Sequence, residues 1–259
     1  MSGYPGGYHL PLVMTSYRAG VVACIDWNVC EFVIIIVMRF SGESSQDASE
    51  YVSPGVELGA VVLTGLLHVV FQGPESKGAF IALASVSWVS YIGWRVRQAP
   101  GLWRHWGFRS DNLKASFFIP SIAFVLSMGG MAVWGWFSGH DLWNEHLIPL
   151  CLLYPIWGVL QQFLVQALGV LNIQKLFPNV GVRSVVLLGA CLFSLVHYPQ
   201  GWLMLATWVL GLVFIPCYLR HRNLWPLGLY HGWLGTFFYL WVLGQDPWDL
   251  AFGAYSRFK

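Results

Sequence analysis

Long apolar runs separated by short polar segments dominate the chain. A helix needs about 20 mostly apolar residues to cross about 30 Å of hydrocarbon. Windows of this kind predict eight membrane-spanning helices, at residues 19–38, 55–73, 78–95, 115–137, 147–171, 182–200, 202–219 and 224–243. The first window is interrupted by Asp26, Asn28 and Glu31. The pattern therefore predicts an all-α polytopic membrane protein, with a single transmembrane domain over residues 1–259.

Composition agrees with a protein embedded in membrane lipids. Hydrophobic residues make up 56% of the 259 residues, charged residues only 10%, and the mean hydropathy is +0.58. A soluble domain has roughly 25% charged residues. The net charge of +2 is small and the basic residues are scattered, so no nucleic-acid partner is expected.

The distribution of Lys and Arg predicts an orientation in the membrane. The loop between the third and fourth windows is strongly basic, with Arg95, Arg97, Arg104, Arg109 and Lys114. Cytoplasmic loops carry such an excess, so this loop is placed inside. With eight crossings, ten of the 14 Lys and Arg residues are cytoplasmic and both termini lie outside.

Polar residues at membrane depth are the main candidates for function, because each costs several kcal/mol unless it is paired or faces a wet cavity. They are Glu57, His68, Gln161, Gln162, Gln166, His197 and His231. Helix residues four apart share a face, so Gln162 and Gln166 should project together, with Gln161 about 100° from Gln162. Glu57 and His68, like Asp26, have no motif around them and are interpreted as helix-packing or cavity groups.

Three short motifs follow one another in the second half of the chain. They are "QQFLVQ" from Gln161, "FSLVH" ending at His197, and "HGWLG" from His231 to Gly235. Their order resembles the CPBP family of membrane proteins, which includes CAAX prenyl endopeptidases and bacteriocin-processing proteins. That family has EExxxR, then FxxxH, then a final His followed four residues later by Asn or a small residue. The resemblance covers about residues 104–243.

This resemblance implies a CPBP-type intramembrane protease fold and, in the family, an endopeptidase acting on a polypeptide substrate. The family-equivalent catalytic positions are Gln161, Gln162, Gln166, His197 and His231. In the family the first Glu polarises a water, and the His residues orient that water, bind a metal or stabilise the oxyanion. The location we expect is the bacterial inner (cytoplasmic) membrane.

The glutamines change the expected activity. A glutamate can take a proton from water and return it to a leaving amine, whereas a primary amide cannot. We therefore predict a catalytically inactive protein that acts as a binding or assembly subunit for a membrane protein partner or a lipid-like ligand. The alternative is an active endopeptidase with an altered mechanism. A structural interpretation also remains, in which the glutamines join helices by hydrogen bonds worth about 0.6–2 kcal/mol each.

A bound cofactor is not expected, although His197 and His231 could hold zinc or another divalent metal with an oxygen of Gln161 or Gln162. Two imidazoles without a carboxylate form a poor site for such ions. An axial tetrapyrrole ligand, or aromatic contacts of the 15 Trp residues with quinone or pigment, stays open.

The depth of the candidate residues poses a geometric problem. A rise of 1.5 Å per residue places His231 at about 10 Å, Gln161 at about 16 Å and His197 at about 20 Å from the cytoplasmic side. Straight helices would not bring them together. Tilted helices, or helices broken near Pro199 and Pro226, could do so where the backbone lines a cavity.

Overall fold

The computed structural model describes residues 52–73 and 76–250, and every regular element within them is helical. The window predicted at 19–38 lies outside these residues. In chain order the elements are α2 (Pro54–Val70), α3 (Lys77–Gln98), α4 (Gly101–His105), α5 (Leu113–Ser138), α6 (Leu147–Gln162), η1 (Phe163–Val170), α7 (Leu171–Leu176), α8 (Val182–Leu195), α9 (Gly201–His221), α10 (Trp225–Phe237) and η2 (Phe238–Val242).

The all-α membrane fold predicted from the apolar windows is confirmed, since each of the seven windows within the described residues coincides with a helix. Within residues 52–73 and 76–250, four helices are long and apolar enough to cross a membrane, whereas α2 and α8 are shorter apolar helices. The four are Lys77–Gln98, Leu113–Ser138, Leu147–Leu176 and Gly201–His221. The number of eight crossings and the side of each terminus remain predictions.

The helix predicted over 182–200 ends early, and this corrects the placement of His197. Helix α8 stops at Leu195, and His197 lies in the turn that leads to α9. The backbone N–H of His197 donates to the Ser194 carbonyl at 3.0 Å, a tight i to i−3 bond. Pro199 follows closely, and a residue before proline is disfavoured in the helical conformation. His197 therefore does not share a regular helical face with Phe193.

The long helix Leu147–Leu176 is not uniform, because its middle section η1 has π-helical geometry. Gln166 lies in this section, whereas Gln161 and Gln162 end the α-helical part. π-Helical turns are rare and often occur at functional sites. The change in winding therefore falls within the first motif.

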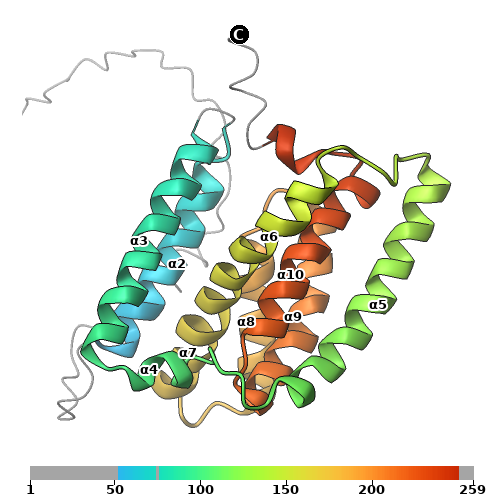
Figure 1. The fold of residues 1–259 in the computed structure, drawn as a ribbon. Coiled ribbons are helices and arrows are strands. Elements are labelled where there is room, and N and C mark those ends of the chain that lie inside the picture. The colour runs from blue at the N-terminus through green and yellow to red at the C-terminus, as the bar shows by residue number, and fades with distance from the viewer. Residues whose placement is uncertain (1–51, 74–75, 251–259) are drawn as a thin grey trace, which may run out of the picture.

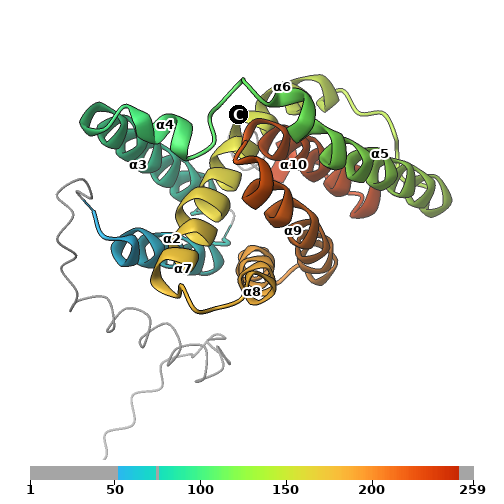
Figure 2. The same ribbon diagram turned by 90° about the horizontal axis from the view of Figure 1, so that it is seen from below.

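Helices α6 and α10 pack side by side in the middle of the molecule, with α5 beyond α10 and the α2–α3 pair on the opposite side (Figure 1). Helices α8 and α9 form a second closely packed pair (Figure 2). Glycines permit the α6–α10 contact: a Cβ on Gly232 would lie 2.6 Å from the Cα of Pro155. Gly158 faces Gly228 and Gly232 in the same way. This close approach brings His231 against α6.

A buried polar cluster fastens α2 to α3 and α7. The Glu57 carboxylate lies 3.5 Å from the Arg95 guanidinium and accepts a hydrogen bond from Asn172 Nδ2 at 2.8 Å. The Tyr91 hydroxyl also donates to Glu57. Glu57, Arg95 and Asn172 are each at most 7% exposed. Glu57 is thus a helix-packing group, in agreement with its interpretation from the sequence.

Candidate functional site

The first and third motifs meet where α6 faces α10. Nε2 of His231 and Oε1 of Gln161 are hydrogen-bonded at 2.9 Å. His231 is 6% exposed, and its other ring nitrogen, Nδ1, has no hydrogen-bond partner. Because an amide oxygen can only accept, Nε2 donates to Gln161, and Nδ1 is left as an unused acceptor.

The second motif joins them from the end of α8. The rings of His197 and His231 have centroids 6.4 Å apart, and the Phe193 ring packs edge-on against both. Nδ1 of His197 donates to the Phe193 carbonyl at 2.9 Å, which fixes the orientation of the imidazole. The turn after Leu195 thus overcomes the difference in depth that straight helices would impose, and the three motifs converge.

The five predicted site residues nevertheless divide into two groups. Gln162 and Gln166 project together, as their spacing predicts, and Gln166 Nε2 donates to Gln162 Oε1 at 3.0 Å. Both side chains are at most 1% exposed, and neither lines the cavity that Gln161 lines. Gln162 Nε2 and Gln166 Oε1 have no partner. The pair lies behind the lining, and only Gln161 of the first motif faces the histidines.

A cavity of about 750 Å³ lies beside the two histidines, within the usual size range of small-molecule sites. Residues of α2, α3, α5, α6, α9 and α10 line it, together with the end of α8. Gln161, His197, His231 and Gly235 are among them. No Asp or Glu occurs among its described lining residues, which are mostly apolar, and Lys77 is the only formally charged one.

The donor set around His197 and His231 does not fit a divalent metal. Among the described residues, no third His, Cys, Asp or Glu approaches this pair closely enough to share an ion. The His231 Nε2 atom is already bonded to Gln161. Zinc sites normally combine three or four His, Cys or carboxylate ligands. A metal at His197 and His231 therefore remains a prediction without structural support, and no step below uses one.

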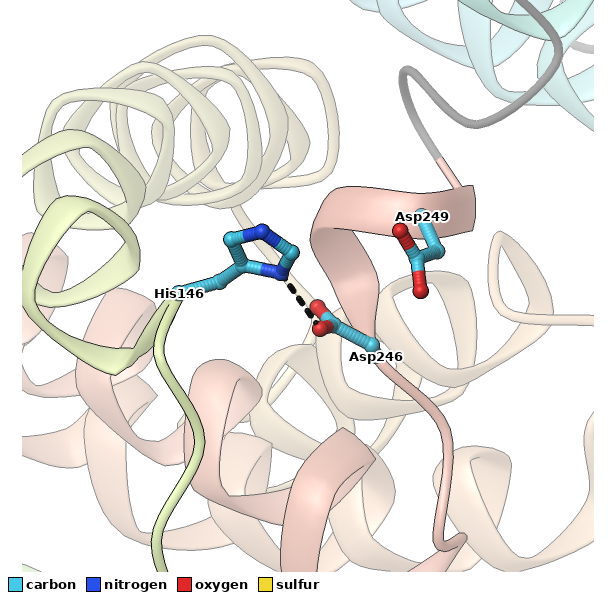
Figure 3. A group of neighbouring side chains, drawn as sticks. All are labelled: His146, Asp246 and Asp249. Atoms are coloured by element: carbon cyan, nitrogen blue, oxygen red, sulfur yellow. Dashed lines mark hydrogen bonds and ion pairs between the residues drawn. The ribbon is translucent and has the colours of Figure 1, made fainter. Parts of the chain in front are cut away.

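One group elsewhere within the described residues has metal-ligand chemistry: His146, Asp246 and Asp249 offer ligand atoms within 4.8 Å of one another. Figure 3 shows the hydrogen bond between His146 and Asp246, at 2.7 Å. Asp246 also accepts from Asn144 and from the backbone N–H of Trp248. These hydrogen bonds explain why the three side chains lie together without an ion. We call the His146–Asp246 pair the clasp, because it joins the segment before α6 to the segment after η2.

The clasp changes the acidity of both partners. The hydrogen bond to Asp246 raises the pKa of His146 above its ordinary value, although desolvation opposes this shift. Burial alone would raise the pKa of Asp246, but hydrogen bonds from His146, Trp248 and Asn144 outweigh it and lower the pKa. Each shift favours the charged form of its group, as expected for an ion pair.

One comparison with known families matches the part of the chain that holds the three motifs. Residues 147–237 match the family model described as "Type II CAAX prenyl endopeptidase Rce1-like". The match spans all three motifs and confirms, over these residues, the resemblance to the CAAX prenyl endopeptidases of the CPBP family. The rest of the predicted region, 104–146 and 238–243, lies outside the match. Neither the curated proteins nor the solved structures include a significant match.

Lys77 is a cavity residue that none of the three motifs indicates. Lys77 begins α3 and His68 lies near the end of α2, and both line the cavity. His197 also lines this cavity, so all three side chains border the same space. The sequence feature that could have indicated this position is a Lys at the start of one apolar window, Lys77, close to a His near the end of the preceding window, His68.

Proposed function

We propose that this protein is a CPBP-type membrane protein that binds without hydrolysing, as a binding or assembly subunit for a membrane protein partner or a lipid-like ligand. The observation that carries the proposal is the composition of the cavity. Gln161 occupies the position of the family's first Glu, and it is hydrogen-bonded to His231 in a cavity with no carboxylate among its described lining residues.

The chemistry of the Gln161–His231 pair supports binding over hydrolysis. Activation of water needs a group that accepts a proton and returns it to the leaving amine, and an amide is neither acid nor base at accessible pH. The same amide and imidazole still donate and accept hydrogen bonds. They can therefore orient a polar group of an occupant inside an otherwise apolar space.

The Gln162–Gln166 pair supports a stable polar site rather than a damaged one. The family motif has Glu and Arg at these positions, and loss of only one would leave a buried charge unpaired, at a cost of several kcal/mol. Here both are neutral amides bonded to each other at 3.0 Å. With two amides neither charge is present, and a hydrogen bond still joins the successive turns.

The alternative function, an endopeptidase of altered mechanism, rests on the convergence of His197 and His231 at the cavity. An imidazole could replace the missing carboxylate as a base. In each histidine the bonded nitrogen donates to an oxygen, which leaves His197 Nε2 and His231 Nδ1 able to accept a proton. Binding is favoured because no carboxylate lines the described part of the cavity and an amide occupies the position of the family's first Glu, and the two functions differ in whether a bound peptide is cleaved.

Isolation of the tagged full-length protein from the membranes of its source in mild detergent tests the proposal. Mass spectrometry of the product should find either one polypeptide partner or one lipid species in a fixed ratio to the chain. Repeated isolation of a lone monomer with neither would contradict the proposal. A parallel His231→Phe variant should lose the occupant if the cavity holds it, and Gly129→Ala, which has open space around its added Cβ, is the matched control.

A further inference from the structure

The cavity has polar lining residues that the three motifs do not explain. Lys77 at the start of α3 and His68 near the end of α2 stand on either side of the α2–α3 connection, and both line the cavity. Most of the remaining lining consists of aliphatic and aromatic side chains, many of them from α3, α5, α9 and α10. The space therefore combines a cationic, hydrogen-bonding part at the α2–α3 connection with an apolar body.

The positive charge of Lys77 has no protein partner among the described residues. None of the ion pairs within 52–73 and 76–250 involves Lys77, and the first turn of α3 contains no acidic residue. Lys77 is half-buried and its side chain lines the cavity. An anion that carries an apolar chain can form a charge-assisted hydrogen bond to such a cation while its chain is buried against the apolar lining.

A second group in the cavity is also incompletely bonded. His231 is 6% exposed, lines the same space, and has no partner for Nδ1. Such buried polar atoms are normally satisfied, and one that is not is explained by a water or by a ligand in the cavity. Lys77 therefore indicates an anionic group in a mainly apolar space, and His231 Nδ1, an acceptor, indicates a separate donor such as a bound water.

We propose that the cavity binds a single-chain amphiphile with an anionic head group, a carboxylate or a phosphate, whose head lies at Lys77 and His68 and whose chain occupies the apolar body. The proposal deepens the lipid-like branch of the proposed function, on which it rests. The volume of about 750 Å³ suits one ligand of moderate size. Attraction to Lys77 selects an anionic head, and the missing carboxylates remove any competing attraction for a cation.

Tryptophan fluorescence offers a direct readout, because Trp88, Trp134 and Trp157 line the cavity. The probes are dibromostearate, which quenches nearby indoles, and its methyl ester, which has the same chain without the charge. Purified full-length protein in nanodiscs of a neutral lipid should show saturable quenching by dibromostearate. Competition by lysophosphatidate or by stearate then distinguishes a phosphate head from a carboxylate head.

Three variants separate the head-group site from the chain site. Lys77→Gln should weaken dibromostearate binding about tenfold or more, because the charge-assisted hydrogen bond to the head group is lost, and should leave ester binding within about twofold. Lys77→Arg should retain the preference for the anion. Lys114→Gln removes the same charge at an exposed residue that does not line the cavity, and should change neither affinity.

The apolar part is tested by filling it. Ala84 lines the cavity from α3, and Ala84→Phe should reduce binding of both probes to a similar extent. Equal affinity of the wild-type protein for acid and ester, or an unchanged acid preference in Lys77→Gln, would overturn the proposal. Peptide cleavage by the same preparation would instead refute the proposed function. If the protein neither cleaves peptides nor prefers the anionic probe, only the proposed class of ligand is refuted.

Discussion

The glycine contact between α6 and α10 should control both stability and the geometry of the site. In Gly232→Ala the new Cβ would lie 2.6 Å from the Cα of Pro155. Non-bonded carbons prefer about 3.5–4.0 Å, so the two helices must separate by about 1 Å. His231 precedes Gly232 directly, and the same displacement would stretch its 2.9 Å bond to Gln161 to about 3.9 Å, beyond hydrogen-bonding range.

The expected loss of stability is about 1–3 kcal/mol, the usual cost of forcing extra atoms into a packed contact. Titration of the detergent-solubilised protein with a denaturing detergent, followed by circular dichroism, measures it. Gly129→Ala in α5 is the control, because nothing lies within 4 Å of its added Cβ, and it should be neutral or slightly stabilising. If Gly232→Ala unfolds at the same midpoint as the wild type and Gly129→Ala, the close α6–α10 contact does not exist.

Two further predictions concern the charged clusters. Arg95→Met leaves Glu57 buried without its cation and should destabilise the protein by about 3–5 kcal/mol. Combining Glu57→Gln with Arg95→Met should recover much of this loss. Equal stability of the single and double variants would contradict the ion pair. The pKa of His146 is raised in the folded protein, so its contribution to stability is complete below its ordinary pKa of 6.5 and is lost as the pH rises through the folded value. The pKa of Asp246 is lowered, so its contribution is complete above its ordinary pKa of 3.8 and is lost as the pH falls through the folded value. The melting temperature should therefore be highest between about pH 4 and 6.5. The His146→Phe variant can still stack on Trp248 and should remove the decrease in melting temperature above this range. An unchanged decrease would show that the His146–Asp246 pair does not titrate.

Much of the fold was predictable because membrane helices leave a simple signal. Apolar windows of about 20 residues located seven helices, and the i to i+4 spacing of Gln162 and Gln166 predicted their contact. The order of three short motifs also indicated that Gln161, His197 and His231 belong to one site. Each of these inferences depends on residues close in sequence or on the fixed geometry of a helix.

The remaining features depend on contacts between distant segments. The end of α8 at Leu195 follows from a turn at Pro199, which a hydropathy window continues through. The separation of Gln161 from the Gln162–Gln166 pair depends on which neighbours pack against each side of α6. Lys77 enters the cavity only because the α2–α3 pair stands opposite α9 and α10, a placement that no local pattern encodes.

Peptide hydrolysis by the purified wild-type protein is the most direct test of the central claim that this cavity binds without cleaving. A library of membrane-embedded peptides, with and without a lipid-modified C-terminal segment, would be incubated with wild-type protein, with His197→Ala, and with a variant combining Gln161→Glu, Gln162→Glu, Gln166→Arg and Gly235→Asn. A Cβ at Gly235 meets nothing closer than 3.8 Å, so the last change has room. We expect no cleavage by wild type or His197→Ala, and any gain of cleavage only in the combined variant. Cleavage by wild type that disappears in His197→Ala would show that the cavity hydrolyses peptides.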